Sequence, residues 1–278
     1  MRVAAARNLA KSLLLLLALA AAFGASGWAL GGYDLLLLFV ACAVGIAGTV
    51  YAYGDRVVLG MAGARELPLA ELPALHSTVE RLAARAGVAK PKLHVLADGH
   101  PRAFAVGRGP ASSSLAVSRG LLAVAPEAEL EGVLAHELAH VRARDVLVHT
   151  IAVVLASTLI ELSRIGGFLE RTLLFVLGPI ASAFVHLLLS PKRELAADRH
   201  AAQLCETPHG LADALIRLEQ TTELVAFAAS PATAPLYTVD PFPREGLPAL
   251  FATQPTVAER VQRLRALDPD WREKLRAA

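Results

Sequence analysis

Long apolar stretches dominate the pattern of hydrophobic and polar positions along this chain. Two of them lie near the N-terminus, at about residues 13–30 and 35–53, and two more lie at about residues 146–162 and 172–189. About 20 helical residues cover the roughly 30 Å hydrocarbon core of a bilayer, so the first two stretches predict transmembrane helices. The later two carry polar residues and predict a helical hairpin, which is either transmembrane, re-entrant or buried in protein.

The first stretch has an alternative interpretation as a secretory signal peptide. Basic residues precede it, and the mostly small residues at 20–26 resemble a cleavage site. A second apolar stretch nevertheless follows after only Gly31-Gly32-Tyr33-Asp34. That arrangement favours an uncleaved membrane hairpin over a cleaved leader.

Basic residues indicate how this hairpin is oriented. Arg2, Arg7 and Lys11 precede the first stretch, and Arg56 and Arg65 follow the second, whereas the short connector has neither Lys nor Arg. Because Lys and Arg accumulate in cytoplasmic segments, both flanks are expected in the cytoplasm. If both later stretches also cross, the C-terminal part of the chain returns to the same side.

Shorter patterns predict a small mixed domain between the apolar stretches. Residues 67–86 carry apolar residues at helical spacing, and residues 92–96, 104–107 and 114–118 predict strands. A turn at 109–113 joins the last two strands. An edge strand of such a sheet can bind an extended peptide through main-chain hydrogen bonds.

The C-terminal part is predicted to be helical around a loop. A helix begins near Pro191, since proline is tolerated in a first turn. The proline-rich residues 231–248 predict a loop, and residues 256–266 predict a helix with Thr256 as N-cap and Glu259 at capping-box spacing. The chain is therefore expected to comprise four parts: a transmembrane helix pair (1–55), a first soluble half (56–145), a helical hairpin (146–190) and a second soluble half (191–278).

Composition agrees with membrane insertion. The 278 residues are 55% hydrophobic and only 19% charged, and the mean hydropathy is +0.48. These values are too apolar for an ordinary soluble domain. A net charge of +2 gives no argument for nucleic-acid binding, and two cysteines are too few for a disulfide framework.

The clearest chemical signal is the sequence His136-Glu137-Leu138-Ala139-His140. It lies in residues 129–141, which have helical spacing of apolar positions. On a helix the two histidines point the same way and can bind one Zn²⁺, while Glu137 is placed to take a proton from metal-bound water. Four other histidines are expected at the surface or in loops: His76, His94, His100 and His209.

A catalytic zinc needs a third protein ligand, and Glu194 is the best candidate. Asp198 lies four residues later on the same helix face, where it can fix the tautomer of one ligating histidine by accepting a hydrogen bond. His200 is a competing third ligand, but it faces away from Glu194. The alternative for the acidic pair is a solvated face with Arg193 and Arg199 as ion-pair partners.

The motifs resemble those of the HtpX-like membrane metalloproteases of the M48 family. The resemblance covers residues 58–267, and the two N-terminal stretches fit as well. Five motifs match in order and rough spacing: residues 103–107, 118–122, 136–140, 193–198 and 259–264.

The resemblance implies an α+β, mainly helical fold, in which a zincin-like metalloprotease domain with a small β-sheet is combined with transmembrane helices. It implies one Zn²⁺ held by His136, His140 and Glu194, with Glu137 as general base. It also implies an integral inner-membrane protein with a cytoplasmic active site, which degrades damaged or misfolded membrane proteins without ATP.

Two positions depart from the family pattern. Arg102 stands where the family usually has Asn, and Gln254 stands where it usually has His. Phe104 and Ala105 follow Arg102 and are candidates for lining the site. Arg260 is either a structural ion-pair partner or a stabilising group near the site.

The sequence therefore predicts a zinc endopeptidase whose partners are unfolded or membrane protein substrates and the lipid bilayer, with no nucleic acid. Two alternatives stay open: a membrane zinc-binding protein or scaffold that has lost catalysis, and a protein in which the motif is accidental.

Overall fold

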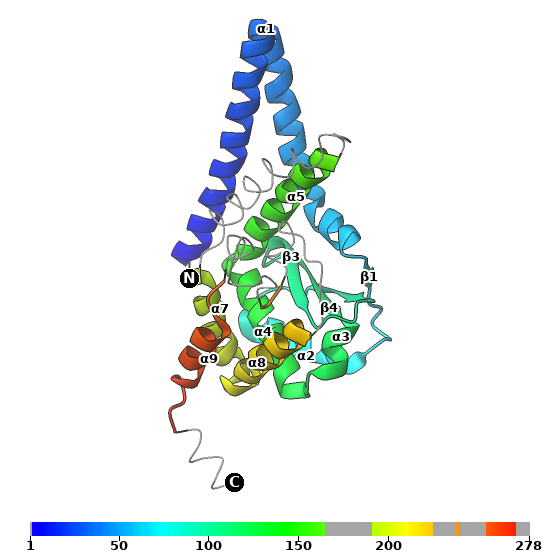
Figure 1. Ribbon diagram of the computed structural model, residues 1–278, viewed down its shortest axis with the longest axis vertical. Coiled ribbons are helices and arrows are strands. Elements are labelled where there is room, and N and C mark those ends of the chain that lie inside the picture. Colours follow the sequence, from blue (N-terminus) through cyan, green and yellow to red (C-terminus); the bar gives the residue numbers. More distant parts are fainter. Residues whose placement is uncertain (1, 165–190, 225–236, 240–253, 271–278) are drawn as a thin grey trace.

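The computed structural model describes residues 2–164, 191–224, 237–239 and 254–270. A long helical hairpin stands on a domain of helices and a four-stranded sheet (Figure 1). The predicted fourth apolar stretch and most of the predicted proline-rich loop lie outside the described residues.

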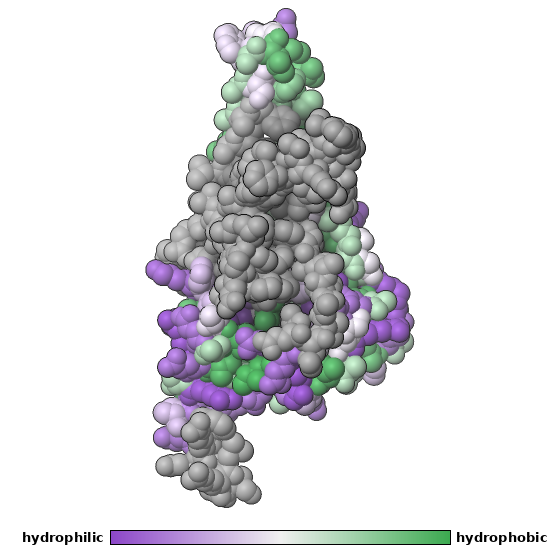
Figure 2. All heavy atoms as spheres, in the orientation of Figure 1, coloured by the Kyte–Doolittle hydropathy of each residue, from purple (hydrophilic) through white to green (hydrophobic). Residues whose placement is uncertain are grey.

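The hairpin is helix α1 (Arg2–Met61), which reverses direction at Gly31 and Gly32. Gly32 has φ 66°, a left-handed conformation that glycine adopts without strain, so the sharp reversal depends on it. Among the described residues, the segment Gly24–Met61 is long and apolar enough to cross a membrane, and 11% of its most apolar window is buried. Figure 2 shows hydrophobic residues beside a few polar ones near the hairpin tip, and most of the hydrophilic residues on the lower domain.

The sheet consists of β1 (Ala64–Glu66), β2 (Lys92–Leu96), β3 (Ala103–Gly109) and β4 (Ser112–Ser118) in the order β1-β2-β4-β3. Strands β2 and β4 are parallel, and the other two pairs are antiparallel. The three predicted strands and the turn between the last two are confirmed. Strand β1 was not predicted, because three largely exposed residues are too short to show an alternating pattern.

Helix α2 (Pro73–Ala86) begins later than the predicted start at Leu67. Leu72 has φ 51°, and the residue before a proline is disfavoured in helical conformation, so the chain enters the helix only at Pro73. Leu67 instead continues the edge of the sheet, where its amide donates to the carbonyl of Leu93 over 2.8 Å.

The expectation that His76 and His94 lie at the surface or in loops is wrong. His76 lies on the inner face of α2 with Nε2 3.1 Å from the carbonyl oxygen of Pro68, and His94 is buried in β2. The backbone holds both rings, since Nδ1 of His94 likewise lies 3.3 Å from the carbonyl oxygen of Lys92. His100 and His209 are half-buried.

Helix α4 (Glu127–Ala143) is the central element and packs against α2, α7, α8 and β3. The main core lies around it, with Leu82, Leu115, Leu134, Leu138 and Leu215 among its buried side chains. The remaining described helices are α3 (Arg119–Val124), α5 (Asp145–Arg164), α7 (Pro191–Cys205), α8 (His209–Leu224) and α9 (Val257–Arg265).

Two predicted helix starts are confirmed. Helix α7 begins at Pro191, and Thr256 caps α9 by accepting a hydrogen bond from the amide of Glu259 over 3.1 Å. The third apolar stretch is helical as α5, which packs along α1. At that contact a Cβ placed on Gly54 would lie 2.9 Å from Cγ2 of Thr150.

The backbones of α4 and α8 touch where they cross. A Cβ on Gly132 would lie 2.5 Å from the amide nitrogen of Leu211, and a Cβ on Gly210 would lie 2.2 Å from the carbonyl oxygen of Ala128. Both distances are too short for a side-chain carbon, so glycine at each position sets the spacing of the two helices.

We therefore expect Gly132→Ala to destabilise the protein by about 1–3 kcal/mol, because the methyl group forces two packed backbones apart. Thermal unfolding of detergent-purified protein, followed by circular dichroism, measures the effect. Gly60→Ala is the matched control, since a Cβ there meets nothing within 4 Å. Equal melting temperatures for both variants would contradict the proposed role of the crossing.

Candidate metal centre

Two histidines of α4 come together as the motif predicts. His136 and His140 lie four residues apart on one helix face, and their Nε2 atoms are 3.2 Å from each other. The rings meet edge to face with centroids 4.7 Å apart, and both side chains are buried.

Glu194 of α7 completes the cluster. Its Oε2 lies 3.4 Å from Nε2 of His136, and its Oε1 lies 3.6 Å from Nε2 of His140. Four ligands arranged tetrahedrally around Zn²⁺ at its usual bond lengths would lie about 3.3 Å apart. The spacing and the nitrogen and oxygen donor set therefore fit a zinc ion, with one coordination position left for water.

The electrostatics of the cluster also favour a cation. Burial alone would lower the pKa of His140, but the carboxylates of Glu194 and Asp145 outweigh it and raise that pKa to about 10. Burial likewise opposes ionisation of Glu194, yet the two histidines hold its pKa well below the usual value. Carboxylates that favour a proton on these rings also favour a metal ion beside them.

Asp198 lies behind His136. Its Oδ1 lies 2.9 Å from Nδ1 of His136, which is ion-pair distance, although Nδ1 has no well-aligned hydrogen-bond partner among the described residues. Arg260 holds the same carboxylate through two donors, Nε at 2.8 Å and Nη2 at 2.7 Å. Burial opposes ionisation of Asp198, but Arg260 prevails and lowers its pKa to about 2.

A second series of contacts, from a histidine to an aspartate and on to an arginine, lies behind His140. The sequence did not indicate it. Nδ1 of His140 lies 3.1 Å from Oδ2 of Asp145, and Arg193 reaches Oδ1 of that carboxylate at 2.7 Å. Nη2 of Arg193 is also 3.3 Å from Nε2 of His149. Asp145 is five residues after His140, beyond Arg144, the C-cap of α4, so helical spacing could not indicate it.

Glu137 points toward the sheet. The amide of Ala105 in β3 donates to its Oε2 over 3.0 Å, and Oγ1 of Thr238 lies 3.5 Å from its Oε1. Burial raises the pKa of Glu137 above the usual value, although both histidines of the cluster oppose the shift. A carboxylate with a raised pKa is a more effective proton acceptor near neutral pH.

The other candidate residues fall into distinct places. Arg260 is fully buried and acts on the site through Asp198. Phe104 packs into a second apolar cluster with Val58 and Val153, so it is a core residue and does not line the metal cluster. His200 does not join the described ligand cluster, but lines a hollow of about 310 Å³ elsewhere on α7.

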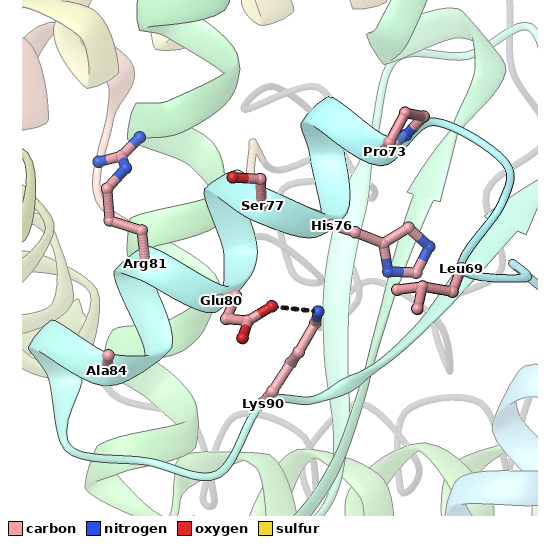
Figure 3. A pocket seen from close by; sticks show the side chains of 8 residues that line it. All are labelled: Leu69, Pro73, His76, Ser77, Glu80, Arg81, Ala84 and Lys90. Carbon is pink, nitrogen blue, oxygen red and sulfur yellow. Dashed lines mark hydrogen bonds and ion pairs between the residues drawn. The ribbon is translucent and has the colours of Figure 1, made fainter.

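A larger hollow of about 440 Å³ lies along α2 (Figure 3). None of its lining residues belongs to the metal cluster, and an ion pair between Glu80 and Lys90 crosses it at 2.8 Å. The described group that could hold a metal ion is therefore separate from this hollow and lies between α4 and α7.

Comparison with known proteins places this arrangement in a family. Residues 70–268 match the description of peptidase family M48. The chain belongs to peptidase family M48. This M48 peptidase is 37% identical over 278 residues to the protease HtpX homolog of Pelotomaculum thermopropionicum, covering 94% of this chain and 99% of the relative.

A second relative is the protease HtpX homolog of Salinibacter ruber, at 40% identity over 252 residues, 87% of the M48 peptidase and 91% of the relative. The crystal structure of S. mikatae Ste24p has a similar fold, with a TM-score of 0.52 at 20% identity. That likeness covers 92% of this chain, which spans only 62% of the Ste24p chain.

We expect Asp145→Asn and Asp198→Asn each to weaken zinc binding roughly 10- to 100-fold, because each removes the charge that orients a histidine of the M48 peptidase. Competition with a chromogenic chelator measures the affinity. Asp213→Asn is the matched control, since Asp213 is an exposed α8 residue paired with Arg265 at 3.4 Å. Wild-type affinity in Asp145→Asn would show that this carboxylate does not support the ligand.

Proposed function

We propose that this M48 peptidase is a membrane-embedded, zinc-dependent endopeptidase of the gluzincin type. His136, His140 and Glu194 hold one Zn²⁺, and Glu137 is the general base. The proposal is carried by one observation: ligand atoms of His136, His140 and Glu194 all lie within 4.8 Å of one another. The buried carboxylate of Glu137 follows His136 on α4.

When bound, Zn²⁺ supplies Lewis acidity that polarises the scissile carbonyl and acidifies a water molecule. Glu137 takes the proton of the attacking water and passes it to the leaving amine. The amide of Ala105 holds Oε2 of Glu137, which fixes the direction in which the base faces. Asp145 and Asp198 keep the histidine rings in orientation through their Nδ1 atoms.

A zincin-like domain is supported by the order of the elements. The helix with the two histidines lies beside edge strand β3, and the third ligand comes from the later helix α7. Ste24p shares the fold, but its low identity limits that likeness to architecture.

Membrane placement is supported by the α1 hairpin, whose exposed side chains include Trp28, Leu30 and Tyr33. Together with the basic flanks, this favours an inner-membrane protein whose peptidase domain lies in the cytoplasm. We infer that damaged or misfolded proteins, including membrane proteins, are the substrates. A peptidase domain held at the membrane surface can bind polypeptides that fail to insert or fold.

We expect Glu137→Gln to reduce cleavage of unfolded casein at least about 100-fold while zinc stays bound, because the base is lost and the ligands are kept. Detergent-purified, zinc-loaded protein is assayed by fluorescence release and its metal content by atomic absorption. Glu131→Gln on the same helix is the control, since its side chain pairs with Arg81 on the surface. Stoichiometric zinc without cleavage by the wild type would favour the alternative, a zinc-binding scaffold.

Orientation has its own test. In a chain with Cys42 and Cys205 replaced by Ala, Tyr33→Cys places a thiol at the hairpin tip and Glu66→Cys places one on exposed β1. We expect a membrane-impermeant maleimide to label only Tyr33→Cys in cells whose outer membrane is permeabilised. Labelling of Glu66→Cys alone would reverse the proposed topology.

A further inference from the structure

The outer edge of β3 is partly covered by side chains. The amide of Ala105 donates to Glu137, the amide of Gly107 donates to Oγ1 of Thr150 over 3.1 Å, and the carbonyl of Ala103 accepts from Oγ1 of Thr238 over 3.3 Å. Strand β3 lies at the edge of the sheet as predicted, and side chains occupy three of the backbone groups that a bound peptide could use.

One of these occupants belongs to a short segment, Tyr237–Val239, that lies beside the base. Thr238 is 4% exposed and Val239 is 9% exposed, so the segment is packed into the protein. Thr238 contacts both the strand edge and the carboxylate of Glu137. The segment thus takes the place beside β3 where an extended substrate would approach the base.

Two residues outside the ligand cluster, Arg102 and Gln254, both hold this segment. Nη1 of Arg102 donates to the hydroxyl of Tyr237 over 3.1 Å, and its guanidinium lies 5.2 Å from the centre of the Tyr237 ring. Nε2 of Gln254 donates to the carbonyl of Tyr237 over 2.6 Å. Arg102 and Gln254, although 152 positions apart in the sequence, therefore both contact Tyr237.

A third restraint comes from the metal side of the site. Nη1 of Arg260 donates to the carbonyl of Thr238 over 2.6 Å, while its other nitrogens hold Asp198. Because Arg260 makes both contacts, substituting it would disturb Asp198 as well as the segment. Neither Arg102 nor Gln254 belongs to the described ligand cluster, so substituting them tests the segment without removing a ligand.

We propose that Arg102 and Gln254 are specificity-determining positioning residues of this peptidase. By holding Tyr237–Val239 against β3, they restrict cleavage to extended polypeptides that can displace the segment. The proposal rests on the proposed peptidase function, and it identifies Tyr237–Val239 as the element with which a substrate competes for the strand edge.

The first test is kinetic. Arg102→Met, Gln254→Ala and the double variant are assayed on unfolded casein with zinc content checked. We expect each single change to lower KM roughly 2- to 10-fold with kcat kept, since each removes about one net hydrogen bond or cation–π contact that substrate must break. A merely structural role would instead lower kcat or zinc content.

Matched controls separate the segment from general effects of charge loss. Arg119→Met removes an exposed arginine, and Gln220→Ala removes an exposed glutamine of α8, both outside the segment's contacts. Arg102 also pairs with Asp98 at 2.8 Å, so Gln254→Ala, which leaves that pair intact, decides the case if Arg102→Met is unstable. Controls that lower KM as much as the test variants would overturn the proposal.

The second test needs no substrate. In the chain without Cys42 and Cys205, Val239→Cys places a buried thiol in the segment. We expect a water-soluble maleimide to label it slowly, and Arg102→Met or Gln254→Ala to accelerate labelling several-fold.

The two tests separate the possible failures. Unchanged labelling alongside normal casein cleavage would overturn the restraint and leave the peptidase function standing. Cleavage by no variant, with zinc bound, would overturn the proposed function and the substrate restriction with it, and labelling would then show only how the segment is held.

Discussion

Buried opposite charges around the histidine pair are the interaction on which the rest of the structure depends. The Arg260–Asp198 pair joins α9 to α7, and the Arg193–Asp145 pair joins α7 to the start of α5. A charge buried without a partner would be strongly destabilising, so each pair requires its helices to be in place together. Four helices therefore meet at one point because their polar groups must be paired there, and the apolar core packs around that requirement.

The consecutive residues His136 and Glu137 of α4 contact different parts of the structure. His136 faces α7 and the ligand cluster, while Glu137 faces β3 and receives an amide hydrogen bond. One step along a helix turns the side chain by about 100°, which is enough to place the two groups against different elements. The sheet thus orients the proposed base, and the later helices orient the proposed metal ligands.

Local patterns predicted much of this arrangement, and long-range contacts account for what they missed. Periodicity and turn residues predicted three strands, and the four-residue spacing of His136 and His140 predicted two of the three candidate ligands. Strand β1 was too short to show a period. Asp145 and Thr238 carry no signal of their own, because their importance arises only from what the folded chain brings beside them. The candidate ligand Glu194 was predictable only because a zinc site needs a third donor.

Helix α5 packs along α1 and links the hairpin to the candidate metal centre. Helix α5 supplies Asp145 to one histidine and Thr150 to strand β3, and it lies against the hairpin at Gly54. The hairpin therefore serves as one wall of the catalytic domain as well as its anchor. A version of this domain cut free of the bilayer segment would expose the back of the helix that supports its own active site.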